Sequence, residues 1–175
     1  LNDVHGRYRA RARPKVLHAR TYEEAIELMD TYDEFLLGLI TDMRFPREGR
    51  LDGTAGWKLV DRVRERNPDL PILIQSVETE HGEHAEDVGV AFVDKQSPQL
   101  LTALRNFMLN YLGFGPFIFR MPDGKVVARA HDMQEMLTAL QDLPPESLAY
   151  HSDGYHFSSW LLARTEFVIA QQIRP

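Results

Sequence analysis

The sequence predicts an α/β domain built around a mostly parallel sheet, followed by a small α+β module. Short apolar runs of strand length alternate with amphipathic segments of helical length up to residue 112. The apolar runs are continuous, which is typical of parallel strands that are covered on both faces. After Gly113 the pattern changes to one hairpin followed by short helices.

Composition narrows the class of protein. The chain has 175 residues, of which 43% are hydrophobic and 26% are charged, as in ordinary globular proteins. Cysteine is absent, which excludes disulfides, thiolate nucleophiles and zinc–thiolate sites. No apolar run approaches the ~20 residues that cross a bilayer, so we expect a soluble, cytoplasmic protein with no membrane partner. The net charge of -6 argues against nucleic acid as the main partner.

We divide the chain into three parts. Residues 1–15 form a basic arm, which we interpret as the end of an upstream helix. Because the chain begins at Leu1 and not at Met, we expect further sequence upstream. Residues 16–113 form the α/β domain, and residues 114–175 form the small module of a hairpin and helices. The length supports one medium domain with a small appendage.

The first elements follow from local patterns. Residues 16–17 predict the beginning of a short strand, and residues 21–24 (Thr-Tyr-Glu-Glu) form a capping box that begins a helix. The apolar run at 35–41 predicts a strand that is covered on both faces and leads to Asp42. We expect residues 45–53 to form a loop.

The alternation then continues through the α/β domain. We predict a helix through residues 57–63, a buried strand at 71–76 and an acidic helix that ends before Gly89. A short strand at 90–93 follows. Ser97 and Pro98 have the residue types of a helix start, so residues 97–112 predict the last helix of the domain.

The second module reads differently. Residues 117–120 and 125–129 flank Met-Pro-Asp-Gly, which predicts a β-hairpin. Asp132 caps a predicted helix that Pro144 and Pro145 end. Two more helical patterns follow, at residues 157–162 and 166–173.

Three polar residues fall at the carboxyl ends of successive predicted strands, namely Asp42, Ser76 and Lys95. Ligands of open parallel sheets bind beyond this edge, so we expect the three side chains to converge. A carboxylate can accept a phosphoryl group directly if nearby groups neutralise the charge of the donor. Lysine supplies that charge and serine supplies a hydroxyl donor.

These segments resemble the receiver domain of two-component response regulators. Residues 41–46 (Thr-Asp-Met-Arg-Phe-Pro) are similar to the segment that carries the phosphoacceptor aspartate, and residues 71–76 to the strand that ends in a hydroxyl residue. In residues 92–95 an aromatic side chain precedes the lysine by three positions. The resemblance covers residues 16–112 and implies a CheY-like (flavodoxin-like) three-layer sandwich whose first strand is missing from this chain.

The resemblance also implies roles for individual residues. Asp42 would be the phosphoacceptor, with Ser76 and Lys95 as catalytic partners and Phe92 as the switch aromatic. The Asp42 carboxylate and the backbone carbonyl of Arg44 would hold Mg²⁺, but the acidic pair of the receiver site is absent from this chain. We therefore expect weak or absent Mg²⁺ binding. A histidine kinase or a small phosphodonor is the implied partner.

Two positions depart from the receiver pattern. Gln96 stands where receivers usually carry proline, and Val77 stands where a small residue usually gives access to the aspartate. Both departures weaken the case for rapid phosphotransfer.

The second module resembles the segment that follows a receiver-like domain at the N-terminus of phosphoenolpyruvate synthase-like and pyruvate phosphate dikinase-like proteins. The similar segments are residues 119–124, 150–151, 156–161 and 163–167. This resemblance implies that the chain is the regulatory part of a larger polypeptide, whose downstream catalytic domains are its partners. The chain itself is then not an enzyme, because nothing in it resembles an ATP-grasp or phosphohistidine domain.

Other interpretations remain open. A degenerate receiver would act as a structural or dimerisation module. In that case a homodimer is one possible assembly of the chain. His151 and His156 are candidates for lining a small ligand pocket, although packing is the commoner role of such residues. His81 and His84 could hold a divalent metal weakly, against the commoner alternative of a solvated acidic face. A dehalogenase-type hydrolase needs a second acid where this chain has Arg44.

Overall fold

The computed structural model describes residues 14–174, and its contacts divide the chain into two compact units. Residues Lys15–Phe107 form the first, here called the N-terminal unit. The described residues from Met108 onward form the C-terminal unit. This division falls earlier than the boundary expected at residues 113 and 114. The predicted basic arm lies outside the described residues, apart from Pro14 and Lys15.

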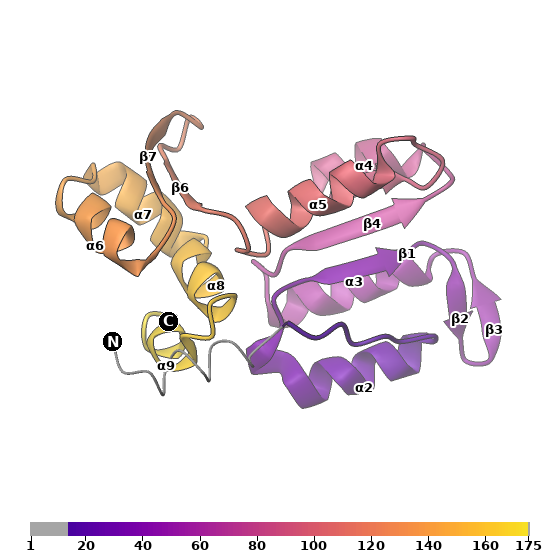
Figure 1. The fold of residues 1–175 in the computed structure, drawn as a ribbon. Helices are drawn as coiled ribbons and strands as arrows, with labels where there is room; N and C mark the ends of the chain where they lie inside the picture. The colour runs from indigo at the N-terminus through magenta and orange to yellow at the C-terminus, as the bar shows by residue number, and fades with distance from the viewer. Residues whose placement is uncertain (1–13, 175) are drawn as a thin grey trace. The chain divides into compact units, whose positions relative to one another are not determined.

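The N-terminal unit is an α/β fold with a parallel sheet, as predicted. The strand order is β1-β4-β5, and both pairs are parallel. Figure 1 shows β1 and β4 running in the same direction. The strands are β1 (Leu39–Asp42), β4 (Ile72–Ser76) and β5 (Ala91–Asp94). The helices are α2 (Tyr22–Tyr32), α3 (Ala55–Arg66), α4 (His81–Asp87) and α5 (Leu100–Asn110).

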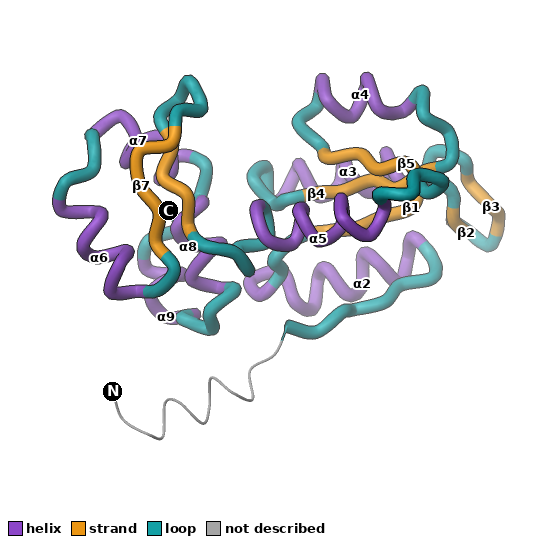
Figure 2. Tube along the Cα trace, turned by 45° about the horizontal axis from the view of Figure 1, so that its top comes forward, coloured by secondary structure: helices purple, strands orange, loops and turns teal. Residues whose placement is uncertain are grey.

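The central strand β4 is buried on both faces. Ile72 and Ile74 join a core cluster with apolar side chains of α2, α3 and α4, among them Met29 and Val63. Leu73 points to the other face and is also buried. Helices α5 and α3 lie on opposite sides of the sheet (Figure 2). The prediction that residues 71–76 form a strand covered on both faces of the sheet is therefore confirmed.

The capping box at the start of α2 is confirmed. The Thr21 hydroxyl accepts a hydrogen bond from the Glu24 N–H at 3.2 Å. The Glu24 carboxylate in turn accepts from the Arg20 N–H at 2.7 Å. These bonds pair N–H groups that the helix itself cannot satisfy, and they set the start of α2.

The predicted loop at residues 45–53 is wrong, because the structure has an antiparallel hairpin there. Its strands are β2 (Phe45–Arg47) and β3 (Arg50–Asp52). Glu48 and Gly49 form the turn with φ values of 52° and 73°. Two left-handed residues give the tight turn that fits the twist of a hairpin. The sequence signal is weak because glutamate, and not asparagine or aspartate, precedes the glycine.

Two strand predictions at the start of the N-terminal unit are also wrong. Residues 16–17 form no strand, and Val16 is 93% exposed. Phe35 belongs to the 3-10 helix η1 (Asp33–Phe35), so that the strand begins only at Leu39. A strand needs a hydrogen-bonded neighbour, and among the described residues β1 pairs only with β4. β1 is thus an edge strand, and its Ile40 is 42% exposed instead of covered.

The C-terminal unit contains the predicted hairpin and a set of short helices. Strands β6 (Phe117–Arg120) and β7 (Val126–Ala130) are antiparallel. The helices are α6 (Met133–Gln141), α7 (Pro145–Asp153), α8 (His156–Leu162) and α9 (Phe167–Gln172). No helix in the described part of the chain is long and apolar enough to cross a membrane.

Helix α7 was not predicted. Pro144 and Pro145 indicate the end of the preceding helix, but Pro145 also stands in the first turn of α7. Proline is tolerated there because the first N–H groups of a helix have no partner within it. The cap of α6 is confirmed, since the Asp132 carboxylate accepts from the Gln134 and Glu135 N–H groups.

Aromatic side chains form the core of the C-terminal unit. Phe117 of β6 stacks on Phe157 of α8 with ring centroids 4.9 Å apart, and it meets the edge of Trp160 at 6.0 Å. The Trp160 Nε1–H donates to the Gly115 carbonyl at 3.1 Å. Hairpin and helices therefore share one aromatic core.

Candidate functional site

The sheet brings Asp42 and Lys95 together at its carboxyl edge. Asp42 is the last residue of β1, and Lys95 follows the last residue of β5. The Lys95 Nζ lies 2.5 Å from the Asp42 Oδ2, so the contact that the sequence predicts is present. The side chains are 31% and 39% exposed, respectively. A reagent in solvent can therefore reach this pair.

The backbone around Asp42 is held by α3. The Asp42 Oδ1 accepts from the N–H of the fully buried Met43 at 2.7 Å. The Met43 carbonyl accepts from the Gly56 N–H at 3.0 Å. A Cβ at Gly56 would lie only 2.6 Å from the Asp42 carbonyl oxygen, so α3 can approach this closely only with glycine. The sequence reading missed Gly56, although a glycine at a helix start was a visible signal.

Ser76 lies at the same edge but makes a different contact. Its side chain is buried, and its Oγ accepts from the Glu78 N–H at 3.0 Å rather than contacting Asp42 or Lys95. Its carbonyl accepts from the Lys95 N–H at 2.9 Å, which ties the end of β4 to the lysine. A hydroxyl that accepts one hydrogen bond still carries a hydrogen to donate.

Phe92 lies in β5 and packs against the core cluster. Its ring adjoins Gly82 of α4, where an added Cβ would lie 3.4 Å from the Phe92 Cδ1. The ring is half-buried between sheet and helix. Its role as a switch stays a prediction.

Three polar side chains, those of Arg44, Glu78 and His81, connect the segments that follow β1 and β4. The Arg44 Nη1 lies 3.3 Å from the Glu78 Oε1, and the Glu78 Oε2 lies 3.1 Å from the His81 Nε2. Arg44 and Glu78 are 54% and 39% exposed, so solvent screens their attraction. The loops after β1 and β4 are thereby linked through side chains.

His81 and His84, which were considered as two ligands of one metal ion, do not belong to the same cluster of possible ligands. Glu78, Glu80 and His81 offer ligand atoms that lie within 4.8 Å of one another. His84 instead packs on the Trp57 ring, with centroids 4.4 Å apart. Carboxylates and imidazole can bind a divalent cation, but exposed groups of this kind also gather without one. The cluster therefore assigns no cofactor.

The second predicted pair, His151 and His156, also comes together. The Nδ1 atoms of the two rings lie 3.0 Å apart, and the His151 Nε2 accepts from the Arg120 N–H at 2.7 Å. His151 is buried. Burial, with smaller contributions from His156 and Arg120, lowers the pKa of His151 to about 4.

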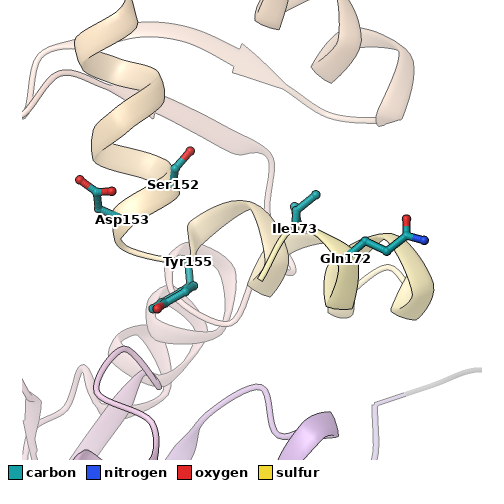
Figure 3. A pocket seen from close by; sticks show the side chains of 5 residues that line it. All are labelled: Ser152, Asp153, Tyr155, Gln172 and Ile173. Atoms are coloured by element: carbon teal, nitrogen blue, oxygen red, sulfur yellow. The ribbon is translucent and has the colours of Figure 1, made fainter. Parts of the chain in front are cut away.

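A pocket of about 490 Å³ lies nearby in the C-terminal unit (Figure 3). Figure 3 shows its lining side chains at the end of α7, at the start of α8 and at the end of α9. They are Ser152, Asp153, Tyr155, Gln172 and Ile173. Neither His151 nor His156 lines this pocket, so the two histidines do not form the ligand site here that the sequence suggested.

Comparison with protein-family models, with curated proteins and with solved structures finds no match for this chain.

Proposed function

We propose that the N-terminal unit is a phosphoacceptor module of two-component-type signalling, similar to a receiver domain, in which Asp42 accepts the phosphoryl group. The observation that carries this proposal is the 2.5 Å contact between the Lys95 ammonium and the Asp42 carboxylate. It occurs at the carboxyl edge of a parallel sheet, where such folds bind their ligands.

The chemistry requires one displacement at phosphorus. An Asp42 carboxylate oxygen forms the new bond to phosphorus, and the bond from phosphorus to the leaving group of the donor breaks with its electron pair. Lys95 lies where a fixed positive charge offsets the charge of the incoming phosphoryl group. Ser76 would donate its hydroxyl hydrogen after a change of rotamer.

Phosphorylation would alter the charge at the sheet edge. A phosphoryl group adds about -1.5 to -2 charges at neutral pH. In our proposal this charge draws the Ser76 hydroxyl inward, and the half-buried Phe92 repacks between β5 and α4. That repacking would carry the signal to a partner surface.

A tight magnesium site fits the described residues poorly. Mg²⁺ needs near-octahedral oxygen ligands and usually more than one anionic group. At this edge the Asp42 carboxylate already accepts from the Met43 N–H and from Lys95, and the predicted second ligand is only the Arg44 carbonyl. We therefore propose weak Mg²⁺ binding, which calorimetric titration of the chain with Mg²⁺ would measure. A tight site would contradict this proposal.

The wider setting is proposed from resemblance alone. The chain would be a cytoplasmic regulatory part of a phosphoenolpyruvate synthase-like or pyruvate phosphate dikinase-like protein. A histidine kinase or small phosphodonor would load Asp42, and the downstream catalytic domains would respond. The chain would carry no catalytic turnover of its own.

One observation favours a second candidate, a degenerate receiver with a structural, dimerisation or ligand-sensing role. Both Asp42 oxygens already have partners, and the Ser76 hydroxyl accepts from Glu78. In this alternative the contact of Asp42 with Lys95 only ties two strand ends together.

Phosphorylation by a small donor separates the two candidates. Incubation with acetyl phosphate and Mg²⁺ should add one phosphoryl mass to the intact chain, and Asp42→Asn should abolish the gain. Asp94→Asn is the matched control, because Asp94 also ends a strand but accepts from the Gln96 N–H at 2.8 Å instead of contacting Lys95. No adduct, or an adduct that survives Asp42→Asn, would overturn the first candidate.

A further inference from the structure

His151 links three elements of the C-terminal unit through its two ring nitrogens. Its Nε2 faces the backbone N–H of Arg120 at the end of β6, and its Nδ1 faces the Nδ1 of His156 on α8. Because a backbone N–H can only donate, the Nε2 must carry a lone pair. The neutral ring then has its hydrogen on Nδ1, and it donates to His156.

Helix α7 holds the end of β6 through the backbone N–H and carbonyl groups of Arg120. Ser147, one turn before His151, donates its hydroxyl to the Arg120 carbonyl at 2.8 Å, while His151 accepts from the Arg120 N–H. The hairpin register is irregular between Phe119 and Arg120, so strand pairing is interrupted here. Ser147 and His151 are 0% and 3% exposed. Water therefore cannot easily replace either bond.

The surroundings of His151 oppose a positive charge. The ring packs against Phe117 and Phe157 at centroid distances of 4.9 and 5.8 Å. Within residues 14–174, the titratable or charged groups that face it are Arg120 of β6, Tyr150 of α7 and His156 of α8. Two of these three carry or can gain a positive charge.

We propose that His151 and His156 form an acid-sensitive latch that holds the end of β6 against α7 only while both rings are neutral. A proton on the His156 Nδ1 removes the acceptor of the His151 N–H. A proton on the His151 Nε2 removes the acceptor of the Arg120 N–H. Either event leaves two hydrogen-bond donors facing each other. One of the two hydrogen bonds that join Arg120, His151 and His156 is then lost.

The direction of the pH effect follows from proton linkage. An unfolded histidine has a pKa near 6.5, and the pKa of the folded His151 is about 4. The folded state thus binds this proton about 300-fold more weakly than the unfolded state. The contribution of the latch is complete above pH ~6.5 and is lost as the pH falls toward 4.

The ring tautomer is the first test, and it uses the unaltered 175-residue chain. Long-range nitrogen NMR at neutral pH distinguishes the two neutral imidazole tautomers. We expect the hydrogen of His151 on Nδ1, and we expect the Arg120 amide to be strongly protected from exchange. A hydrogen on Nε2 would overturn the proposal.

The second test measures urea midpoints against pH, with Trp160 as the reporter. The urea midpoint of the wild type should decrease as the pH is lowered from 6.5 to 4. The control His131→Gln, which alters an exposed histidine of the same unit, should show the same decrease. His151→Gln keeps an acceptor for the Arg120 N–H but does not titrate, so its profile should be flatter. In His156→Gln the decrease should be smaller, because the charge of His156 no longer helps to lower the pKa of His151. An unchanged profile in His151→Gln would overturn the latch, and if that variant does not fold, the tautomer measurement decides.

Discussion

Lys95 contributes more to the proposed chemistry of the sheet edge than to its stability. Its contact with Asp42 is short, but both side chains are about one-third exposed. Exposed ion pairs stabilise proteins by only about 0–1 kcal/mol. A fixed positive charge beside a phosphoacceptor, by contrast, stabilises the charge that gathers in the transition state.

Replacement of Lys95 tests this distinction. We expect Lys95→Met to slow phosphoryl uptake from acetyl phosphate at least tenfold, while the free energy of unfolding changes by less than about 1 kcal/mol. Intact mass against time and urea unfolding measure the two quantities. Lys58→Met is the matched control, since Lys58 contacts Asp52 at 2.7 Å on the same unit. A large loss of stability with unchanged uptake would mean that the pair is structural.

The position of Asp42 depends on how two elements, β1 and α3, pack at one point. Gly56 in the first turn of α3 donates to Met43 and leaves no space for a side chain. The two nearest atoms are backbone atoms, the Asp42 carbonyl oxygen at 2.6 Å and the Met43 Cα at 2.9 Å, so a methyl group must move α3 or the Asp42 segment. The Met43 Sδ lies slightly farther away, at 3.1 Å.

Gly56→Ala should therefore destabilise the N-terminal unit. Overpacking of a close contact costs about 1–3 kcal/mol, and alanine regains up to about 1 kcal/mol through its helix propensity. We expect a net lowering of the urea midpoint, followed by Trp57 fluorescence. Gly53→Ala is the control, because no atom lies within 4 Å of an added Cβ there. Equal midpoints for the two variants would contradict the steric argument.

At the scale of the whole molecule, each unit has its own core and its own tryptophan. Trp57 packs against the core cluster of the N-terminal unit, and Trp160 is buried in the aromatic core of the C-terminal unit. In the C-terminal unit, Arg164 lies over the Trp160 ring and donates to the Gly113 and Gly115 carbonyls at 2.6 and 2.8 Å. Burial lowers the pKa of Arg164 to about 10.

Arg164→Lys should affect one unit and spare the other. A lysine cannot reproduce the planar fork that bonds two carbonyls and stacks on the indole. We expect a loss of about 1–3 kcal/mol in the transition that Trp160 reports and no shift in that of Trp57. Fluorine NMR of the chain labelled with fluorotryptophan follows both residues in one urea titration. The exposed Arg129→Lys is the control, and a common shift of both signals would contradict independent cores.

Several elements could be predicted because their causes are local. The apolar run at 71–76, the capping box at Thr21 and the cap at Asp132 each depend on residues a few positions apart, and each prediction is confirmed. The contact of Asp42 with Lys95 also followed, since the ends of parallel strands meet at one edge.

The sequence by itself determined the α/β class of the N-terminal unit, the helix starts at Thr21 and Asp132 and the polar residues at the strand ends. The helix start predicted at Ser97 and Pro98 is wrong, because α5 begins only at Leu100. Only the tertiary structure decided that β1 begins at Leu39, that Gly56 leaves room for no side chain and that His151 is an interior acceptor for Arg120. Periodicity and capping act within a few residues of the chain. Pairing, close approach and burial depend on neighbours far away in sequence, which local patterns do not encode.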